Sequence, residues 1–317
     1  MENFFIFIPL KLFHKYHTDA SLRFSQLILS RLITLIINFN ETIMKFIDSS
    51  IDQFYTQSQE ELRLSVGLGP LEFERNKILI SRYLIPSGKI ADIGGGPGHY
   101  AQWLAGLGHD VTLIDPVKKH INQAKKRSAK NFFYCLQGEA RNLALDDASQ
   151  DLIIMHGPLY HLQEEGDRIA ALREAGRKLK KNGIILGFAI THSASAVAAL
   201  HSGLIYQNEI CAMCAEELSS GIHEPPSGFP FMLPKGFYHR PSELIAEFST
   251  AGFETIDLLP VEGMAWLDGN FFQNWADPLK RSQLLRLIQM TEKDRELLCF
   301  SPHIMLAAKL NADSCLF

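Results

Sequence analysis

The sequence predicts an α/β protein with a doubly wound, mostly parallel sheet, and two observations carry this prediction. Residues 89–98 read KIADIGGGPG, a short apolar strand that ends in an acid and continues into a glycine-rich turn. Glycines permit positive φ angles and let a ligand approach the main chain, which favours a nucleotide-like cofactor at this turn. After the turn, apolar strand-like runs alternate with helical segments. Such alternation indicates a parallel sheet with helices on both faces and a ligand site at the carboxyl ends of the strands.

The chain before the first strand has two parts. Residues 1–47 differ in composition from the rest, and we expect an N-terminal extension: either an amphipathic helix for a surface or partner, or a loosely attached segment with Met44 as the true start. Arg31 interrupts its longer apolar run, which is shorter than the roughly 20 apolar residues of a membrane helix, so no transmembrane span is expected. Residues 51–84 have apolar positions at helical spacing, and the break at Gly67 and Gly69 predicts two helices.

The first part of the predicted sheet lies within residues 86–190. Strands are expected at 89–93, 111–115, 132–136, 151–155 and 184–189, separated by helices at 98–107, 117–129 and 167–179. Polar residues or glycines follow several of these strands, notably Asp115, Glu139 and His156. Because the carboxyl ends of parallel strands share one edge of the sheet, we expect these side chains to gather there.

Two long insertions interrupt the rest of the expected domain, which spans residues 48–317. The first covers about 191–240, with an Ala-rich start and a Gly/Pro-rich end, and the second covers about 261–300. Long insertions beside a site are often lids. The core resumes over about 241–310, with a helix that opens at Arg240-Pro241, a strand at 254–259 and a last strand at 303–309.

Composition narrows the classes of function. A length of 317 residues with 46% hydrophobic side chains is enough for one or two domains with a large core. The net charge of −4, with acids and bases interspersed, argues against a nucleic-acid partner. Five cysteines, an odd number, do not resemble a disulfide framework, so we expect a cytoplasmic protein, and we expect no metal centre.

The spacing of the glycines separates two classes of cofactor. A dinucleotide-binding loop needs G-x-G-x-x-G/A, but His99 occupies the third small position, so a nicotinamide-dependent oxidoreductase remains only the alternative. The pattern present, Asp92-x-Gly94-x-Gly96-x-Gly98, resembles motif I of class I S-adenosylmethionine-dependent methyltransferases. The acid at the end of the next strand lies about 20 residues further on, where a ribose diol needs a carboxylate acceptor.

From about residue 51 to residue 310 the chain resembles this family, in particular a bacterial subgroup similar to small-molecule methyltransferases. The strings that carry the resemblance are residues 91–98, 113–115, 138–140, 157–162, 239–241 and 261–263. The resemblance implies S-adenosylmethionine as cofactor and a sheet of order 3-2-1-4-5-7-6 with strand 7 antiparallel. It implies that Gly94, Gly96 and Gly98 line the methionine end of the cofactor and that Asp115 takes the ribose hydroxyls. Glu139 and Ala140 would flank the adenine. The other residues expected to face the cofactor are Asp92, His156, Tyr55, Glu72 and Arg75. Glu139 stands where many relatives have Asp.

The acceptor site is expected just after the strand at 151–155. The chain there lacks the Asn-Pro-Pro-Tyr string of nucleic-acid and protein amide methylators, which favours a small-molecule acceptor. Tyr160 and His161 are the candidate catalytic residues, because a neutral histidine near physiological pH could take the acceptor's proton. The substrate-binding candidates come from the first insertion and its end: Tyr206, Phe229, Tyr238, His239 and Arg240.

Each of these assignments has a structural alternative. Asp92 could hold the glycine loop, Asp115 could cap the following helix, and Tyr160 with His161 could pack at a helix start. The candidates before the first strand could be surface residues in helix ion pairs. The alternative at the level of function is a non-catalytic, S-adenosylmethionine-binding regulatory module.

Overall fold

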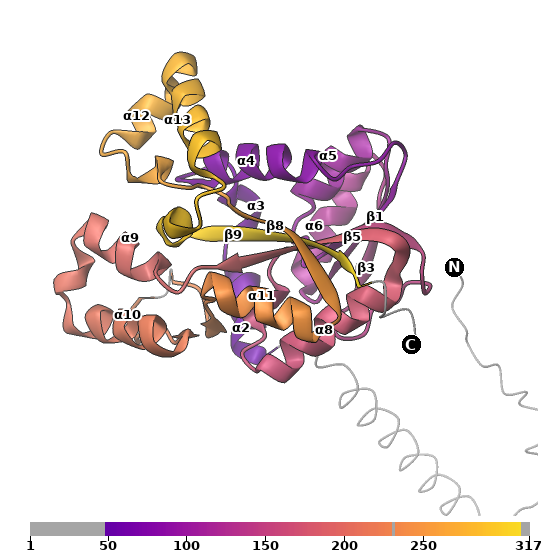
Figure 1. Ribbon diagram of the computed structural model, residues 1–317, viewed down its shortest axis with the longest axis horizontal. Helices are drawn as coiled ribbons and strands as arrows, with labels where there is room; N and C mark the ends of the chain where they lie inside the picture. Colours follow the sequence, from indigo (N-terminus) through magenta and orange to yellow (C-terminus); the bar gives the residue numbers. More distant parts are fainter. Residues whose placement is uncertain (1–47, 230–231, 312–317) are drawn as a thin grey trace, which may run out of the picture. The chain divides into compact units, whose positions relative to one another are not determined.

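A computed structural model describes residues 48–229 and 232–311 (Figure 1). The extension expected over residues 1–47 lies outside the described residues. Within the described part, no helix is long and apolar enough to cross a membrane.

A seven-stranded sheet forms the centre of the fold, in the order β3-β2-β1-β4-β5-β9-β8. Its strands are β1 Lys89–Ile93, β2 Asp110–Asp115, β3 Tyr134–Gln137, β4 Gln150–Met155, β5 Leu179–Ile190, β8 Phe253–Pro260 and β9 His303–Leu310. The first five pair in parallel, and β9 runs antiparallel to both β5 and β8. Counted without the short ribbon described below, this is the predicted order 3-2-1-4-5-7-6 with an antiparallel seventh strand, so the predicted fold is confirmed.

Helices cover both faces of this sheet because the strands are apolar on both sides. Along β4, Leu152 and Ile154 pack in one core cluster, whereas Ile153 and Met155 pack in another, as expected from the two-residue period of a strand. The first cluster includes residues of α4 Gly69–Ser81, α5 His99–Gly106 and α6 Lys118–Ser128. The second includes residues of α7 Pro158–His161, α8 Glu165–Lys178 and α11 Pro241–Thr250. Figure 1 shows α4 and α5 on one side of the sheet and α8 and α11 on the other.

Two predicted boundaries are wrong. Three helices rather than two precede β1, because the single turn α3 Glu60–Arg63 separates α2 Ser49–Gln57 from α4. The helix expected to run to 179 ends at Lys178, and β5 begins at once with a register shift opposite β4. Gly183 lies in this irregular stretch, and a Cβ there would stand only 3.0 Å from the Gln150 carbonyl oxygen, so the glycine permits close packing at this point.

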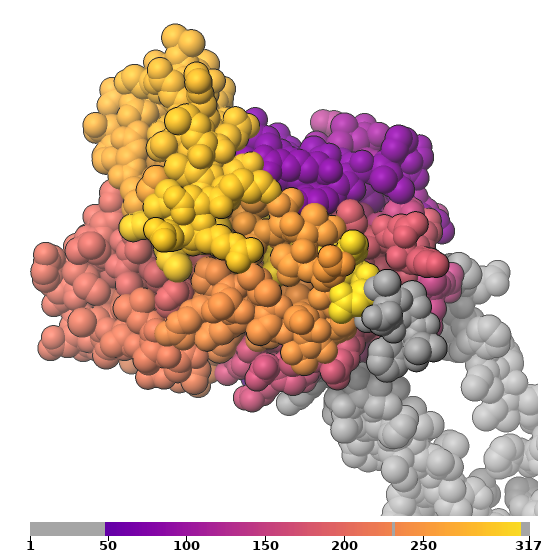
Figure 2. All heavy atoms as spheres, in the orientation of Figure 1, coloured from indigo at the N-terminus to yellow at the C-terminus, as the bar shows by residue number. Residues whose placement is uncertain are grey.

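Both insertions follow strands that end at the carboxyl edge of the sheet. The first, after β5, contains α9 Ala194–Ser202, α10 Asn208–Ser220 and a two-stranded ribbon of β6 Ile222–His223 and β7 Gly236–Phe237. The second, after β8, contains α12 Phe271–Ala276 and α13 Pro278–Thr291. The first has a small hydrophobic core of its own, whereas the core of the second also contains Leu71 of α4. Both project from the same side of the domain (Figures 1 and 2).

Candidate functional site

The glycine turn after β1 contains glycines with different roles. Gly94 has a φ of 72°, and a Cβ there would lie 1.9 Å from the carbonyl oxygen of His156. Gly98 has a φ of 87° at the start of α5, where a Cβ would meet the ring of Phe133 at 2.9 Å. Gly96 also has a positive φ, 55°, but nothing lies within 4 Å of where its Cβ would be. Packing therefore requires Gly94 and Gly98, whereas Gly96 leaves open space beside the main chain.

Asp115, at the end of β2, joins the glycine turn to α6. Its Oδ2 accepts a hydrogen bond from the Gly96 amide at 2.9 Å, and its Oδ1 accepts one from the Val117 amide at 2.9 Å. Nδ1 of His120 lies 3.1 Å from Oδ1. Val117 precedes the first turn of α6, which has no side-chain cap, so the helix-capping alternative is wrong; Oδ2, with one partner, can accept a further hydrogen bond. The same carboxylate can hold the turn and still receive a hydroxyl group.

Asp92, which is buried, and His156, which is half-buried, are polar residues at the ends of the neighbouring strands β1 and β4. The side chain of Asp92 is fully buried, and neither of its oxygens has a hydrogen-bond partner among the described residues. Nδ1 of His156 lies 3.6 Å away, too far for a hydrogen bond, and the ring is stacked between Tyr100 and Phe188. An unpaired buried carboxylate costs several kcal/mol, so this position suits a ligand that brings a cationic or hydrogen-bond-donating group.

Tyr55, from α2, and His161, from α7, meet beside Asp115. The Tyr55 hydroxyl hydrogen-bonds to Nε2 of His161 at 2.7 Å, and the Tyr55 ring packs edge-on against His120. Burial, together with smaller contributions from His223 and His120, lowers the pKa of His161 to about 3. His161 is therefore neutral at physiological pH, as predicted, but it is a weak base with one ring nitrogen already engaged.

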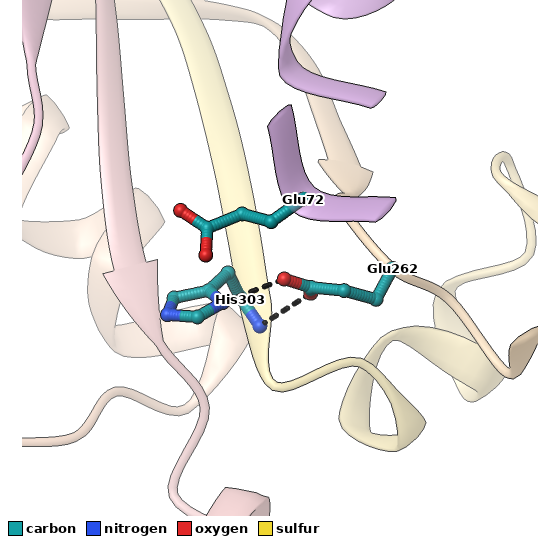
Figure 3. A group of neighbouring side chains, drawn as sticks. All are labelled: Glu72, Glu262 and His303. Carbon is teal, nitrogen blue, oxygen red and sulfur yellow. Dashed lines mark hydrogen bonds and ion pairs between the residues drawn. The ribbon is translucent and has the colours of Figure 1, made fainter. Parts of the chain in front are cut away.

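A third group of polar side chains lies at the same edge of the sheet and was not among the predicted catalytic residues. Glu72, Glu262 and His303 offer ligand atoms that all lie within 4.8 Å of one another (Figure 3). Glu262 follows β8 and His303 starts β9, so the antiparallel course of β9 brings its first residue to the carboxyl edge. Arg63 of α3 forms an ion pair with Glu72 at 2.5 Å. The sequence signal for this group was the string that contains Glu262.

Three predicted cofactor residues have protein partners. Arg75 is completely buried and its guanidinium forms an ion pair with Glu292, far along the chain in the second insertion. Glu139 accepts hydrogen bonds from the backbone and side chain of Arg141. Ala140, 5% exposed, belongs to the hydrophobic core. These contacts make Arg75 a core ion-pair residue, and they leave the adenine assignment of Glu139 and Ala140 a prediction.

The predicted substrate-binding residues do not converge in one place. Tyr206 is 85% exposed, and Phe229 packs in the small core of the first insertion. Tyr238 is buried and stacks on His223 with ring centroids 4.5 Å apart. His239 was expected to bind the substrate, but it is fully buried and its Nε2 lies 3.1 Å from Glu247 of α11.

The end of the first insertion contacts the rest of the domain through Arg240 and Gly236. Arg240 is the N-cap of α11, where its guanidinium pairs with Glu243 and donates to a carbonyl of α10. Gly236 of β7 comes so close to the loop after β4 that a Cβ there would stand 2.4 Å from the Tyr160 carbonyl oxygen. The insertion therefore packs against the predicted catalytic residues through its ribbon.

Comparisons with known proteins agree with this geometry. A family model described as "Methyltransferase domain" matches residues 91–187, the segment that holds the glycine turn, Asp115 and His156. A search of curated proteins found no match. Among solved structures, an S-adenosylmethionine-dependent methyltransferase from Methanosarcina mazei is similar with 17% identity and a TM-score of 0.51, covering 73% of this chain and 96% of its own.

Two further structures show the same fold. The CcbJ methyltransferase from Streptomyces caelestis has 15% identity and a TM-score of 0.52, over 82% of this chain and 98% of its own. An S-adenosylmethionine-dependent methyltransferase described as putative, from Listeria monocytogenes, has 12% identity and a TM-score of 0.51, over 76% and 99%. At these identities the likeness is one of fold. Residues 91–187 therefore match a methyltransferase domain, within a chain that has the fold of these solved methyltransferases.

Proposed function

We propose that this protein transfers the methyl group of S-adenosylmethionine to a small molecule bound at the carboxyl edge of the sheet. The observation that carries the proposal is the fully buried, unpartnered carboxylate of Asp92 next to the open space at Gly96. A cofactor with an ammonium group and a ribose would find there a carboxylate, free main-chain surface and the Asp115 oxygens within one short segment of sheet edge.

The chain's own residues would divide the binding of the cofactor between them. Asp92 would pair with its ammonium group, Asp115 would accept from the ribose hydroxyls, and Glu139 with Ala140 would lie at the adenine. His156, stacked between two aromatic rings, would contribute a polar edge close to Asp92. When bound, S-adenosylmethionine supplies an electrophilic methyl group, and the protein supplies orientation and a site protected from water.

The acceptor would lie against Tyr160 and His161. Both side chains are half-buried after β4, and Tyr55 closes over His161 from α2. The approach of Gly236 to the Tyr160 carbonyl supports a lid role for the first insertion. Aromatic walls of this kind exclude water and suit an apolar or planar acceptor.

The charges of the protein support a small molecule rather than a nucleic acid as the methyl acceptor. The net charge is −4, and the basic residues near the site, such as Arg63, are already paired with carboxylates. A nucleic-acid methylator would need free cationic side chains for phosphate groups. Among the described residues all four cysteines are free thiols, which supports a reducing, cytoplasmic location.

Titration calorimetry with S-adenosylmethionine, S-adenosylhomocysteine and NAD, followed by a screen of methyl acceptors, tests the proposal. We expect binding of the first two ligands, no binding of NAD, and production of S-adenosylhomocysteine with at least one small acceptor. Binding of NAD alone would favour the oxidoreductase alternative. Cofactor binding without transfer to any small acceptor would favour a regulatory module or a macromolecular acceptor.

A further inference from the structure

Glu262 is fixed by a set of hydrogen bonds that leaves its carboxylate aimed at one imidazole. Its Oε2 accepts from the His303 amide at 3.1 Å, and its Oε1 lies 2.7 Å from Nδ1 of His303. The Ser301 hydroxyl lies 3.1 Å from Oε2 and 2.7 Å from the His303 carbonyl oxygen, and its one proton is shared between them. The Ser301 oxygen in turn accepts from the amides of Glu262 and Gly263. Glu262 is 2% exposed, so the carboxylate has little freedom to take another orientation.

This carboxylate determines which nitrogen of His303 is available. Because Oε1 accepts from Nδ1, the neutral ring carries its proton on Nδ1 and its free electron pair on Nε2. Nε2 lies on the side of the ring away from Glu262 (Figure 3), and no hydrogen bond to it occurs among the described residues. The side chain of His303 is 27% exposed, so a small molecule can reach it. A histidine held by a carboxylate, with the other nitrogen free, is the arrangement of a general base.

The charged groups around His303 come from several elements. Burial lowers its pKa, but the carboxylates of Glu262 and then Glu72 outweigh this effect and Arg63 opposes them, so the pKa of His303 is raised above 6.5. His161, the base expected from the sequence, differs on both points: its Nε2 is bonded to Tyr55 and its pKa is about 3. Of the two histidines, His303 is the stronger base and the one with a free nitrogen.

A metal ion is the competing occupant of the same cluster. Two carboxylates and an imidazole are a possible ligand set. However, both oxygens of Glu262 already accept hydrogen bonds from Ser301 and His303, and Glu72 is paired with Arg63. A metal held by both carboxylates would have to compete with these bonds, so the geometry favours the base.

We propose that His303, held by Glu262, is the general base that deprotonates the methyl acceptor. The acceptor atom gives its proton to Nε2 and uses the freed electron pair to bond the methyl carbon, whose former bond breaks with its electrons left on the cofactor's sulfur. This inference rests on the proposed function and narrows it. An acceptor that needs a base carries a proton at neutral pH, so it is a hydroxyl, a thiol or an ammonium group rather than a carbon or a thioether.

The first test follows the titration of His303 by NMR in protein labelled with ¹³C-histidine and saturated with S-adenosylhomocysteine. The resonance is assigned from its absence in His303→Gln. We expect a pKa above 6.5 in the wild type that falls in Glu262→Gln, and no change in the matched control Glu254→Gln, an exposed residue on β8. A pKa at or below 6.5, or one that Glu262→Gln leaves unchanged, overturns the pairing on which the inference rests.

The second test measures methyl transfer to three probes that differ in the protic atom: a phenol, a thiophenol and a primary arylalkylamine. His303→Gln should lower kcat by about 10²–10⁴-fold on the accepted probe and leave the Kd for S-adenosylhomocysteine within twofold. The exposed His201→Gln is the control and should change neither. Glu262→Gln should move the acidic limb of the pH–rate profile to lower pH, because the base then loses a proton more readily.

The remaining outcomes are also distinct. Methyl transfer by His303→Gln at the wild-type rate overturns the assignment of His303 as the general base. The same holds if the wild-type protein methylates none of the three probes. Stoichiometric binding of Mn²⁺ or Zn²⁺ that both Glu72→Gln and His303→Gln abolish overturns it in favour of a metal site. Failure of the wild type to bind S-adenosylhomocysteine counts against the proposed function itself, whereas normal binding with an unshifted His303 overturns only this inference.

Discussion

The hydroxyl of Tyr55 lies 2.7 Å from Nε2 of His161, although 106 positions separate the two residues in the sequence. The contact ties α2, near the start of the described chain, to the loop after β4. The rings also pack edge-on, with centroids 5.4 Å apart. The Tyr55 ring contributes to the burial of the His161 imidazole, and burial is the largest cause of its lowered pKa.

The enclosure of His161 predicts a pH dependence of stability. The unfolded chain binds a proton at this ring as the pH falls below 6.5, whereas the folded protein does so only near the pKa of about 3. Because the unfolded state then holds more protons, the free energy of unfolding falls as the pH drops from 6.5 toward 3. At pH 5 the protonation of this ring in the unfolded chain lowers the free energy of unfolding by at most about 2 kcal/mol.

Urea unfolding at pH 7 and pH 5 measures this share. His161→Asn should reduce the difference between the two pH values, while the exposed His201→Asn should leave it unchanged. A His161→Asn protein with the full wild-type pH dependence would show that the imidazole titrates normally in the folded state.

Asp115→Ala should weaken the binding of S-adenosylmethionine by about 1.5–3 kcal/mol, the range for a hydrogen bond to a charged group. Because the carboxylate also accepts from the Gly96 and Val117 amides, we expect a stability loss of about 1–2 kcal/mol from these two lost hydrogen bonds. Calorimetry measures the first effect and urea unfolding the second. Asp110→Asn, at the exposed opposite end of β2, is the control. A stability loss without a change in affinity would mean that Asp115 only holds the glycine turn and the residue before α6.

Much of the fold could be predicted from the sequence because its strands are buried on both faces. Apolar runs such as the one in β4 mark each strand locally, and the glycines between runs mark the turns. The early start of β5 could not be predicted, since the register shift opposite Gln150 depends on a neighbouring strand. The one-turn helix α3 was missed because four residues carry too little periodicity.

The same distinction applies to the site. Asp92, Asp115 and His156 each follow a strand, so position along the chain was enough to nominate them. The pair of Glu262 and His303 is different, because 41 residues and a complete insertion separate them and only the antiparallel pairing of β8 and β9 unites them. His239 was misplaced for a related reason: its partner Glu247 belongs to the helix that follows, and that contact draws the ring into the core.

Arg75→Met should destabilise the protein without affecting the cofactor. The substitution leaves Glu292 with only Arg82 as a partner, at 2.9 Å, so we expect a loss of about 3 kcal/mol or less. Arg82→Met, which removes the more exposed partner, should cost less. Urea unfolding and calorimetry with S-adenosylhomocysteine separate the two effects. A large loss of affinity in a stable Arg75→Met protein would restore the cofactor role expected from the sequence.

Gly94→Ala and Gly96→Ala form a matched pair that tests where the cofactor approaches the main chain. A Cβ at Gly94 would stand 1.9 Å from the His156 carbonyl oxygen, and neither backbone segment can move away without disrupting β1 or β4, so we expect a loss of more than about 4 kcal/mol. A Cβ at Gly96 meets nothing, so alanine there costs only about 1–2 kcal/mol for its positive φ. In the stable Gly96→Ala protein the methyl group occupies the space that we assign to the cofactor. Its Kd for S-adenosylhomocysteine should therefore rise at least tenfold, and an unchanged Kd would mean that the ligand lies elsewhere along the sheet edge.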